Sequence, residues 1–397
     1  MEKIKKNIGL EYAHIFLKNI NVTHGIWVIY LISKGFSMIH IGLFESLFHI
    51  SSIMFEVPTG IVADLYGRKL SRIISLLIAL LYFSILLFSD NLYMICLAFI
   101  LLGLSYTFES GSGEALVYDS LKEMDKEEDF KKVNGRREVL YQLGSMIGLI
   151  VGGYFAMTSY NINFIFMFAV YAVVLIVTSL MKEVKHEISE SVSVTQRFKN
   201  HFIDSTKVVL KNNRLFYLIV ISALFAAPVT TVFFFAQDYF LELSYSKAML
   251  GLVLGLHSLT AALGGFLAYK IEAKWGQRKI LFMIPLLLLI CFSFMIFPNL
   301  YTIGFILLGF FDSLFYVVMA DYINKITPSN KRATILSFSS FAFSIVMIVI
   351  FPLIGFFIDT FNMTTANMIL AGIVVILYMM LIVILRSSKW EEGMKSQ

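Results

Sequence analysis

Apolar runs of about 20 residues recur from one end of this chain to the other, and they constrain its fold more than any other feature. A helix of that length crosses a hydrocarbon layer of about 30 Å. Hydrophobic residues make up 58% of the 397 residues and charged residues only 15%, whereas a soluble domain carries about 25% charged residues. We therefore predict an all-α polytopic membrane protein.

Twelve spans are predicted from the hydropathy pattern. They lie near 10–32, 39–62, 71–88, 92–118, 136–157, 162–181, 214–240, 247–269, 280–298, 301–322, 332–357 and 363–385. When the connections are assigned to alternate sides, 29 of the 32 Lys and Arg residues fall on one side or in the two ends of the chain. Basic connections stay in the cytoplasm. We expect both termini to be cytoplasmic and the membrane to be a plasma membrane, that of a bacterium.

The two halves of the chain resemble each other in sequence. Asn91-Leu92-Tyr93 followed by Phe99–Gly103 matches Asn299-Leu300-Tyr301 followed by Phe305–Gly309. We predict two six-span halves, residues 1–181 and 214–397, with a substrate cavity at their interface. Residues 182–213 would join them as a polar linker with an amphipathic interfacial helix, or as a disordered segment.

The most specific motif lies between the second and third predicted spans, in residues 58–69. There Gly60 would let another helix approach closely, Asp64 would face Arg68 one helical turn on, and Gly67 would make the turn. The segment resembles the signature loop of the major facilitator superfamily. A plain basic loop would explain the positive charges but not the Gly and Asp spacing.

The resemblance implies that this loop works as a conformational latch. Arg68, which Lys69 follows, would then meet an acidic residue at the cytoplasmic end of the fourth span, and Asp119 occupies that position. The superfamily also implies two bundles of six helices that rock around a central substrate site.

The fifth predicted span carries four glycines, Gly144, Gly148, Gly152 and Gly153. They resemble the glycine motif of the 12-span drug/proton antiporters of the superfamily, although Leu149 stands where that motif has proline. Glycines at this spacing also serve simply to pack membrane helices closely. Both interpretations stay open.

A second difference from the antiporter group is in the fourth span, where the group has a buried arginine. Alignment through Gly111 and Gly113 puts Thr107 at that position. Glu109 and Glu114 are the ionisable residues that this span offers instead. If protons drive transport, they must be bound by a different arrangement.

Ionisable residues inside apolar spans cost about 2.5–3.5 kcal/mol each at the membrane centre, so they usually face a cavity or a partner. In the second span Glu45, His49 and Glu56 share one helix face with Ser52. They form either a proton or cation site or ion pairs with Lys18 of the first span. Further candidates are Lys18 itself and Asp312, which has no basic residue in its own span. We expect the lone His257 to be a hydrogen-bonded core residue.

We therefore predict a secondary transporter, most specifically a proton-coupled exporter of small amphipathic compounds or drugs. The alternative within the superfamily is uptake of a nutrient or metabolite, and a membrane scaffold or intramembrane enzyme is the alternative outside transport. No metalloprotease, nucleotide-loop or nucleophile motif is present, so we expect no enzyme. The expected partners are the substrate, protons or sodium ions and the lipid bilayer. No nucleic acid, metal or cofactor is expected, and the chain should be a monomer.

Overall fold

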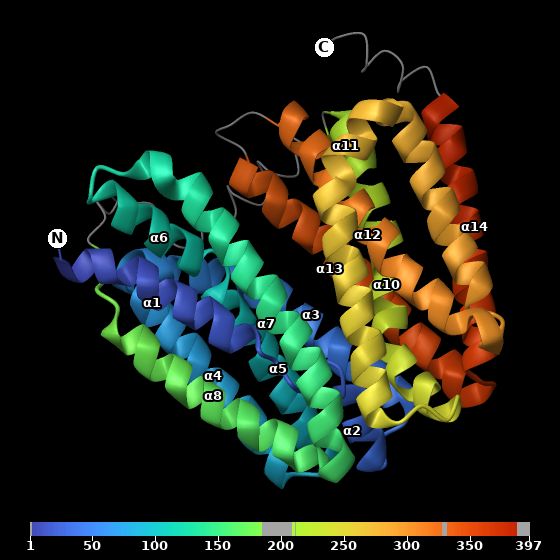
Figure 1. Ribbon diagram of the computed structural model, residues 1–397, viewed down its shortest axis with the longest axis horizontal. Coiled ribbons are helices and arrows are strands. Elements are labelled where there is room, and N and C mark those ends of the chain that lie inside the picture. Colours follow the sequence, from blue (N-terminus) through green and yellow to red (C-terminus); the bar gives the residue numbers. More distant parts are fainter. Residues whose placement is uncertain (1, 185–208, 211, 328–331, 387–397) are drawn as a thin grey trace. The chain divides into compact units, whose positions relative to one another are not determined.

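The computed structural model describes residues 2–184, 209–210, 212–327 and 332–386, and in these ranges it contains helices and no strands. Most of the predicted linker, 185–208, lies outside the described residues, so its amphipathic helix stays a prediction. The helices, labelled in Figure 1, are α1 (Glu2–Asn19), α2 (Trp27–Ser33), α3 (Met38–Tyr66), α4 (Arg68–Phe88), α5 (Leu92–Glu109), α6 (Ser112–Lys122), η1 (Glu127–Asp129), α7 (Phe130–Thr158), α8 (Tyr160–Leu180), α10 (Asn213–Glu242), α11 (Lys247–Phe294), α12 (Pro298–Ile326), α13 (Arg332–Thr360) and α14 (Met363–Arg386).

Helices occupy all twelve predicted spans, although two of the spans are interrupted. Among the described residues, ten helical segments are long and apolar enough to cross a membrane, with α5 and α6 taken as one of them. The 48-residue α11 turns at Gly276, where φ is 70°, and so contains the eighth and ninth predicted spans. The first predicted span, 10–32, is occupied by α1 and α2.

Two spans that we predicted as continuous helices are broken. The first is interrupted at residues 20–26, where polar side chains replace the lost helical hydrogen bonds. Asn163 of α8 donates from Nδ2 to the carbonyl oxygens of Val22 and Gly152, at 2.8 Å each. The fourth is interrupted after Glu109, because Gly111 takes a left-handed conformation with φ 70°.

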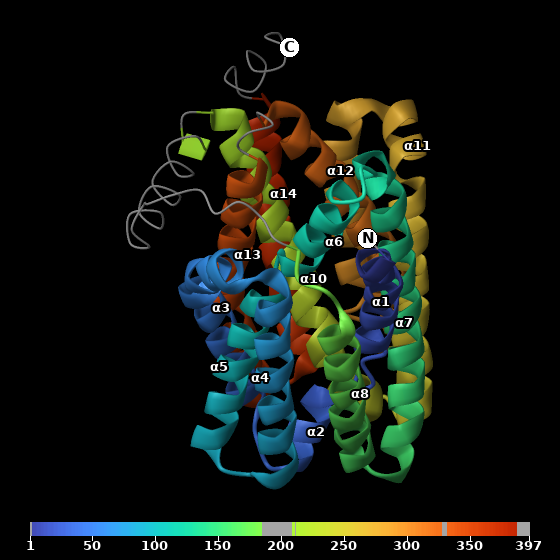
Figure 2. The same cartoon turned by 90° about the vertical axis from the view of Figure 1, so that its left-hand side faces the viewer.

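The chain forms two compact units. The first consists of Met1–Gly35, Phe44–Val194 and Tyr245–Gly255, and the second of Phe36–Leu43, Thr195–Ser244 and Leu256–Gln397. In the first unit α1 packs against α7 and α8, and α4 packs against α5 and α8, as Figures 1 and 2 show. In the second unit α10 packs against α12, α13 and α14.

The internal repeat seen in the sequence is matched by the packing in both units. A Cβ atom on Gly103 of α5 would lie 2.5 Å from the carbonyl oxygen of Phe48 in α3. A Cβ atom on the matching Gly309 of α12 would lie 2.6 Å from the carbonyl oxygen of His257 in α11. The fourth and tenth spans thus use equivalent glycines to contact the second and eighth spans.

Candidate functional site

The predicted latch pair, Arg68 and Asp119, is formed in the structure. Arg68 Nη1 lies 2.9 Å from Asp119 Oδ2, and the two side chains are 19% and 15% exposed. Arg68 is the first residue of α4 and Asp119 lies on α6, the short helix that follows the break in the fourth span. The ion pair therefore ties the start of the third span to the end of the fourth.

Glu183, which we did not predict, also fixes this end of α4. Its two carboxylate oxygens accept hydrogen bonds from the backbone N–H groups of Arg68 and Lys69, at 3.0 and 2.9 Å. A carboxylate in this position satisfies free N–H groups and interacts favourably with the helix dipole. Gly67 is required beside it, because φ is 108° there and a Cβ atom would collide with the Glu183 carboxylate.

One detail of the predicted loop motif turns out differently. A Cβ atom on Gly60 would meet nothing within 4 Å among the described residues, so no described helix approaches this glycine closely. Asp64 is exposed, and its predicted contact with Arg68 stays a prediction. The turn at Gly67 is confirmed by its positive φ.

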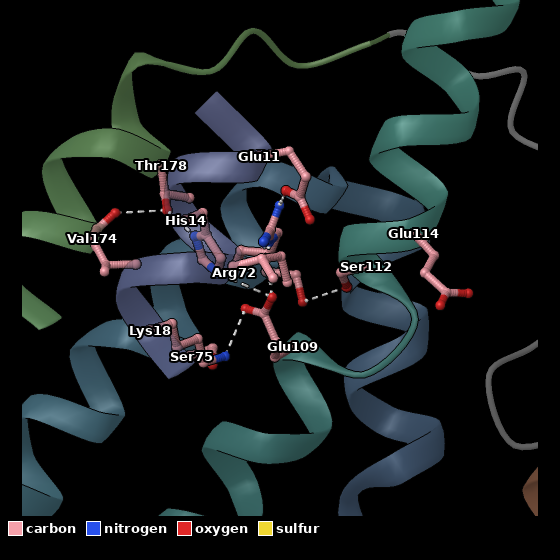
Figure 3. A network of polar contacts seen from close by, with 12 residues as sticks. Glu11, His14, Lys18, Arg72, Ser75, Glu109, Ser112, Glu114, Val174 and Thr178 are labelled. Atoms are coloured by element: carbon pink, nitrogen blue, oxygen red, sulfur yellow. Dashed lines mark hydrogen bonds and ion pairs between the residues drawn. The ribbon is translucent and has the colours of Figure 1, made fainter. Parts of the chain in front are cut away.

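A buried ion network joins helices of the first unit, and Figure 3 shows most of its members. Glu11 of α1, 1% exposed, accepts from Nη1 of Arg72 and lies 3.0 Å from Nε of Arg137. Arg72 of α4 is fully buried, and its Nε and Nη2 atoms both lie 3.0 Å from Oε1 of Glu109. Two carboxylates and two guanidinium groups thus link α1, α4, α5 and α7.

Two further residues of α1 reach the same carboxylate, Glu109. His14 Nε2 lies 3.3 Å from its Oε1 atom, and Lys18 Nζ lies 3.4 Å from its Oε2 atom. On its other side the His14 ring contacts the Thr178 hydroxyl of α8 at 2.8 Å. We call these six residues, Glu11, His14, Lys18, Arg72, Glu109 and Arg137, the Glu109 network.

Positive charge exceeds negative charge in the Glu109 network, because two carboxylates face two arginines and Lys18. Glu114 adds a third carboxylate only at the edge, 3.8 Å from Arg137 and 64% exposed. Buried charges of this kind are costly to leave unpaired. The network can therefore accept a proton or lose one only if its partners rearrange.

A glycine makes room for the two guanidinium groups. A Cβ atom on Gly113 of α6 would lie 3.3 Å from Arg137 Nη2 and 3.4 Å from Arg72 Cζ. In the sequence comparison Gly113 served to place Thr107 where the antiporter group has its arginine. Arg72 of the neighbouring span brings a guanidinium to this region from α4 instead.

The four glycines of the fifth span pack against backbone. Cβ atoms on Gly144 and Gly148 would lie 2.8 Å from the carbonyl oxygen of Phe16 and 2.5 Å from the amide nitrogen of Asn21. Gly152 abuts the carbonyl of Val22, and Gly153 abuts that of Lys247. The first three glycines thus seat α7 on the end of α1 and on the break that follows it, and Gly153 seats it on the start of α11, which fits the packing interpretation.

The polar face of the second span is largely buried, as expected. Glu45 and His49 are 9% and 5% exposed, and His49 Nε2 lies 3.7 Å from Glu45 Oε1. Further along the helix, Ser110 donates to Glu56 at 3.4 Å. The predicted ion pair with Lys18 is not the one formed, because Lys18 faces Glu109 of the fourth span instead.

Asp312 lies half-buried in the middle of α12, and no ion pair or hydrogen bond of its side chain is found among the described residues. Asp321 of the same helix forms an exposed ion pair with Lys325. His257 is a hydrogen-bonded core residue, as predicted, since its Nδ1 atom lies 2.8 Å from the carbonyl oxygen of Phe305.

Sequence reasoning missed Arg72, Arg137 and the role of Glu11. The signal was present, because Arg72 and Arg137 lie just inside predicted apolar spans and Glu11 shares a helix face with Lys18. We counted both arginines as basic loop residues. The sequence pattern does not show which of the spans far apart in the sequence lie next to each other.

The chain is similar in sequence to a known protein family and to individual known proteins. A family model described as Major Facilitator Superfamily matches residues 19–246 and 230–395. An uncharacterized MFS-type transporter of Bacillus subtilis strain 168, YxaM, is 27% identical over 326 residues, which is 79% of each chain. A class H tetracycline resistance protein of Pasteurella multocida is 24% identical over 255 residues, 62% of this chain and 61% of that protein.

Solved structures of similar fold include two transporters. The nucleoside transporter NupG has a TM-score of 0.79 at 14% identity, and the match covers 98% of this chain and 100% of NupG. A D-xylose-proton symporter has a TM-score of 0.74 at 13% identity, with 96% of each chain covered. Because the family model matches nearly the whole chain, the protein belongs to the Major Facilitator Superfamily and is a membrane transporter.

Proposed function

We propose that this protein is a proton-coupled exporter of small amphipathic compounds that works by alternating access. The observation that carries the proposal is the Glu109 network, in which one carboxylate is shared by Arg72, His14 and Lys18. Ionisable groups inside membrane spans usually mark ion or proton pathways. The 24% identity to a tetracycline resistance protein supports the export direction.

In this proposal the Glu109 network binds the coupling proton, and Glu45, His49, Glu56 and Asp312 contribute to substrate or ion binding. A proton that neutralises Glu109 would release Lys18 and loosen the contact with Arg72. The half-buried Asp312 offers a carboxylate to cationic parts of a substrate. Glu114, which is largely exposed, would act only as a peripheral charge.

The latch pair would control the rate of the conformational change rather than substrate binding. Asp119 lies on α6, directly after the break that follows Glu109. A change at Glu109 could therefore reach the Arg68–Asp119 ion pair through one short helix. We further propose two six-span halves with cytoplasmic termini, in a bacterial plasma membrane, acting as a monomer.

Everted membrane vesicles test both the direction and the coupling. Vesicles with this protein are energised with a respiratory substrate, and accumulation of tetracycline, ethidium and a bisbenzimide dye is followed. Proton-coupled export predicts accumulation of at least one probe, its collapse on addition of an uncoupler, and its loss in Glu109→Gln but not in Glu114→Gln.

The competing function is uptake of a nutrient or metabolite. Uptake predicts that right-side-out cells accumulate a compound under a proton gradient and that the everted vesicles accumulate none of the probes. Vesicles without probe accumulation across the panel, together with substrate-driven alkalinisation in whole cells, would replace the export proposal with uptake.

A further inference from the structure

His14 and Arg72 are the least exposed residues of the Glu109 network, each with 0% of its side chain accessible. Its two ring nitrogens face different partners, as Figure 3 shows. Nδ1 lies 2.8 Å from the Thr178 hydroxyl oxygen, and Nε2 lies 3.3 Å from Oε1 of Glu109. Both nitrogens of a fully buried imidazole are therefore next to a polar group.

The Thr178 hydroxyl can serve His14 in either charge state. Its oxygen also lies 2.8 Å from the carbonyl oxygen of Val174, one turn earlier in α8. A hydroxyl carries one proton and can rotate it toward either neighbour. Toward His14 it donates to a bare Nδ1 atom, whereas toward Val174 it leaves its oxygen free to accept from Nδ1–H.

The Glu109 carboxylate lies beside the other nitrogen. Nε2 is 3.3 Å from Glu109 Oε1 without the geometry of a hydrogen bond, so a positive charge on the ring would be held there by an ion pair. At Nδ1 neither state leaves a buried donor or acceptor without a partner, which is otherwise costly. A histidine with only a structural role needs hydrogen-bond partners for one charge state alone.

Several charges act on a proton at this position. On α1 Glu11 and Lys18 lie one turn to either side, and Arg72 of α4 shares Glu109 with His14. From α7 Arg137 acts through Glu11. On α8 Tyr171 lies within electrostatic reach of Glu109. The two carboxylates favour the imidazolium, and the three basic groups oppose it.

We propose that His14 is a proton-binding residue of this transporter and that the Thr178 hydroxyl is its switching partner. The step is a proton transfer from a hydronium ion. One O–H bond of the hydronium breaks and leaves a water molecule, an Nδ1–H bond forms on His14, and the Thr178 hydroxyl turns from Nδ1 to the Val174 carbonyl. One part of this inference rests on the proposed function, namely that the proton bound by His14 drives transport.

The protonated His14 ring competes with Arg72 for the same Glu109 oxygen. Glu109 is the last residue of α5, two residues before the left-handed Gly111, which precedes the helix that carries Asp119. A shift of Glu109 toward α1 would therefore act at the break in the fourth span. Protonation of His14 could thus affect the Arg68–Asp119 ion pair without any contact between His14 and that pair.

Nuclear magnetic resonance of the full-length protein in lipid nanodiscs, with ¹⁵N-labelled histidine, tests the proposal without any substrate. The chain has 7 histidines, and the His14 signal is the one lost in His14→Gln. Should that variant fail to fold, replacing the other histidines one at a time assigns His14 by elimination. The signal is followed between about pH 8 and pH 5, the range in which histidines ordinarily titrate.

We expect the neutral ring to carry its proton on Nε2 and to become imidazolium within that range. In Thr178→Val the imidazolium at a given acidic pH should be populated about tenfold less, because its Nδ1–H loses a hydrogen bond that is stronger for the charged than for the neutral ring. Thr178→Ser, which keeps the hydroxyl, should restore it. The proposal would be overturned if the His14 ring stayed neutral down to about pH 5, or if its imidazolium population were the same in Thr178→Val as in the wild type.

The two proposals fail separately. If His14 titrates as described while everted vesicles show no export, the proton-binding inference stands and the export direction is wrong. If export depends on the proton gradient while His14 stays neutral, the proton is bound elsewhere and only the His14 inference falls.

Discussion

Replacing Gly148 of α7 with alanine should destabilise the first unit, and a second glycine of the same helix provides the matched control. The new Cβ atom would lie 2.5 Å from the amide nitrogen of Asn21 and 2.9 Å from its carbonyl carbon and oxygen. These are backbone atoms of the break between α1 and α2, so no side chain can turn aside. Gly135, also within α7, has nothing within 4 Å of such a Cβ atom.

Both substitutions gain the same helix propensity, about 1 kcal/mol, so the difference between them isolates the clash. Overpacking costs about 1–3 kcal/mol, and we expect Gly148→Ala to be less stable than Gly135→Ala by that amount. The measurement is the free energy of unfolding in mixed micelles with a chemical denaturant. Equal stabilities would refute the close contact between α7 and the break, and loss of transport without loss of stability would favour the antiporter interpretation of the glycines.

Three further variants test the ion pairs. Glu11→Gln should lower the free energy of unfolding by about 3 kcal/mol, which is the lower end for a broken buried ion pair because Arg72 keeps its second carboxylate, Glu109. Glu114→Gln at the exposed edge should change the free energy of unfolding by less than about 0.5 kcal/mol. Equal losses for the two variants in the same denaturant assay would contradict the network. Arg68→Ala should slow turnover of a probe without weakening its binding to the purified protein, and loss of binding would mean that the latch contacts the substrate. Glu183→Ala removes the acceptor of two N–H groups at the start of α4 and should lower the free energy of unfolding by about 1 kcal/mol in the same assay, with no such loss in Glu183→Asp, which keeps the carboxylate.

The helical architecture follows from the sequence because each span is a local property of about 20 residues. The repeat was also readable, since Gly103 and Gly309 recur at matching positions and prove to make matching contacts. The breaks at residues 20–26 and at Gly111 were not predicted. Both lie within predicted spans, and the first depends on Asn163, a residue of another span, to satisfy the carbonyl group of Val22.

The sequence predicted several residues of the candidate site but few of the ion pairs between them. Glu109 and Lys18 were both identified, yet as members of separate groups, because helical spacing shows which residues share a face and not which faces meet. The latch pair was predicted correctly only because a family resemblance supplied the long-range contact of Arg68 with Asp119. No such resemblance existed for Arg72, which reaches the network from a position that reads as the end of a basic loop.

The most direct test of the account is whether Glu109 couples the proton gradient to transport. Purified wild-type protein and Glu109→Gln are reconstituted in liposomes, and a probe that the everted vesicles accumulate is followed with and without an imposed proton gradient. We predict that the wild type concentrates the probe, and that Glu109→Gln exchanges it across the membrane but does not concentrate it. Concentration of the probe by Glu109→Gln at the wild-type level would contradict the claim that the Glu109 network binds the coupling proton.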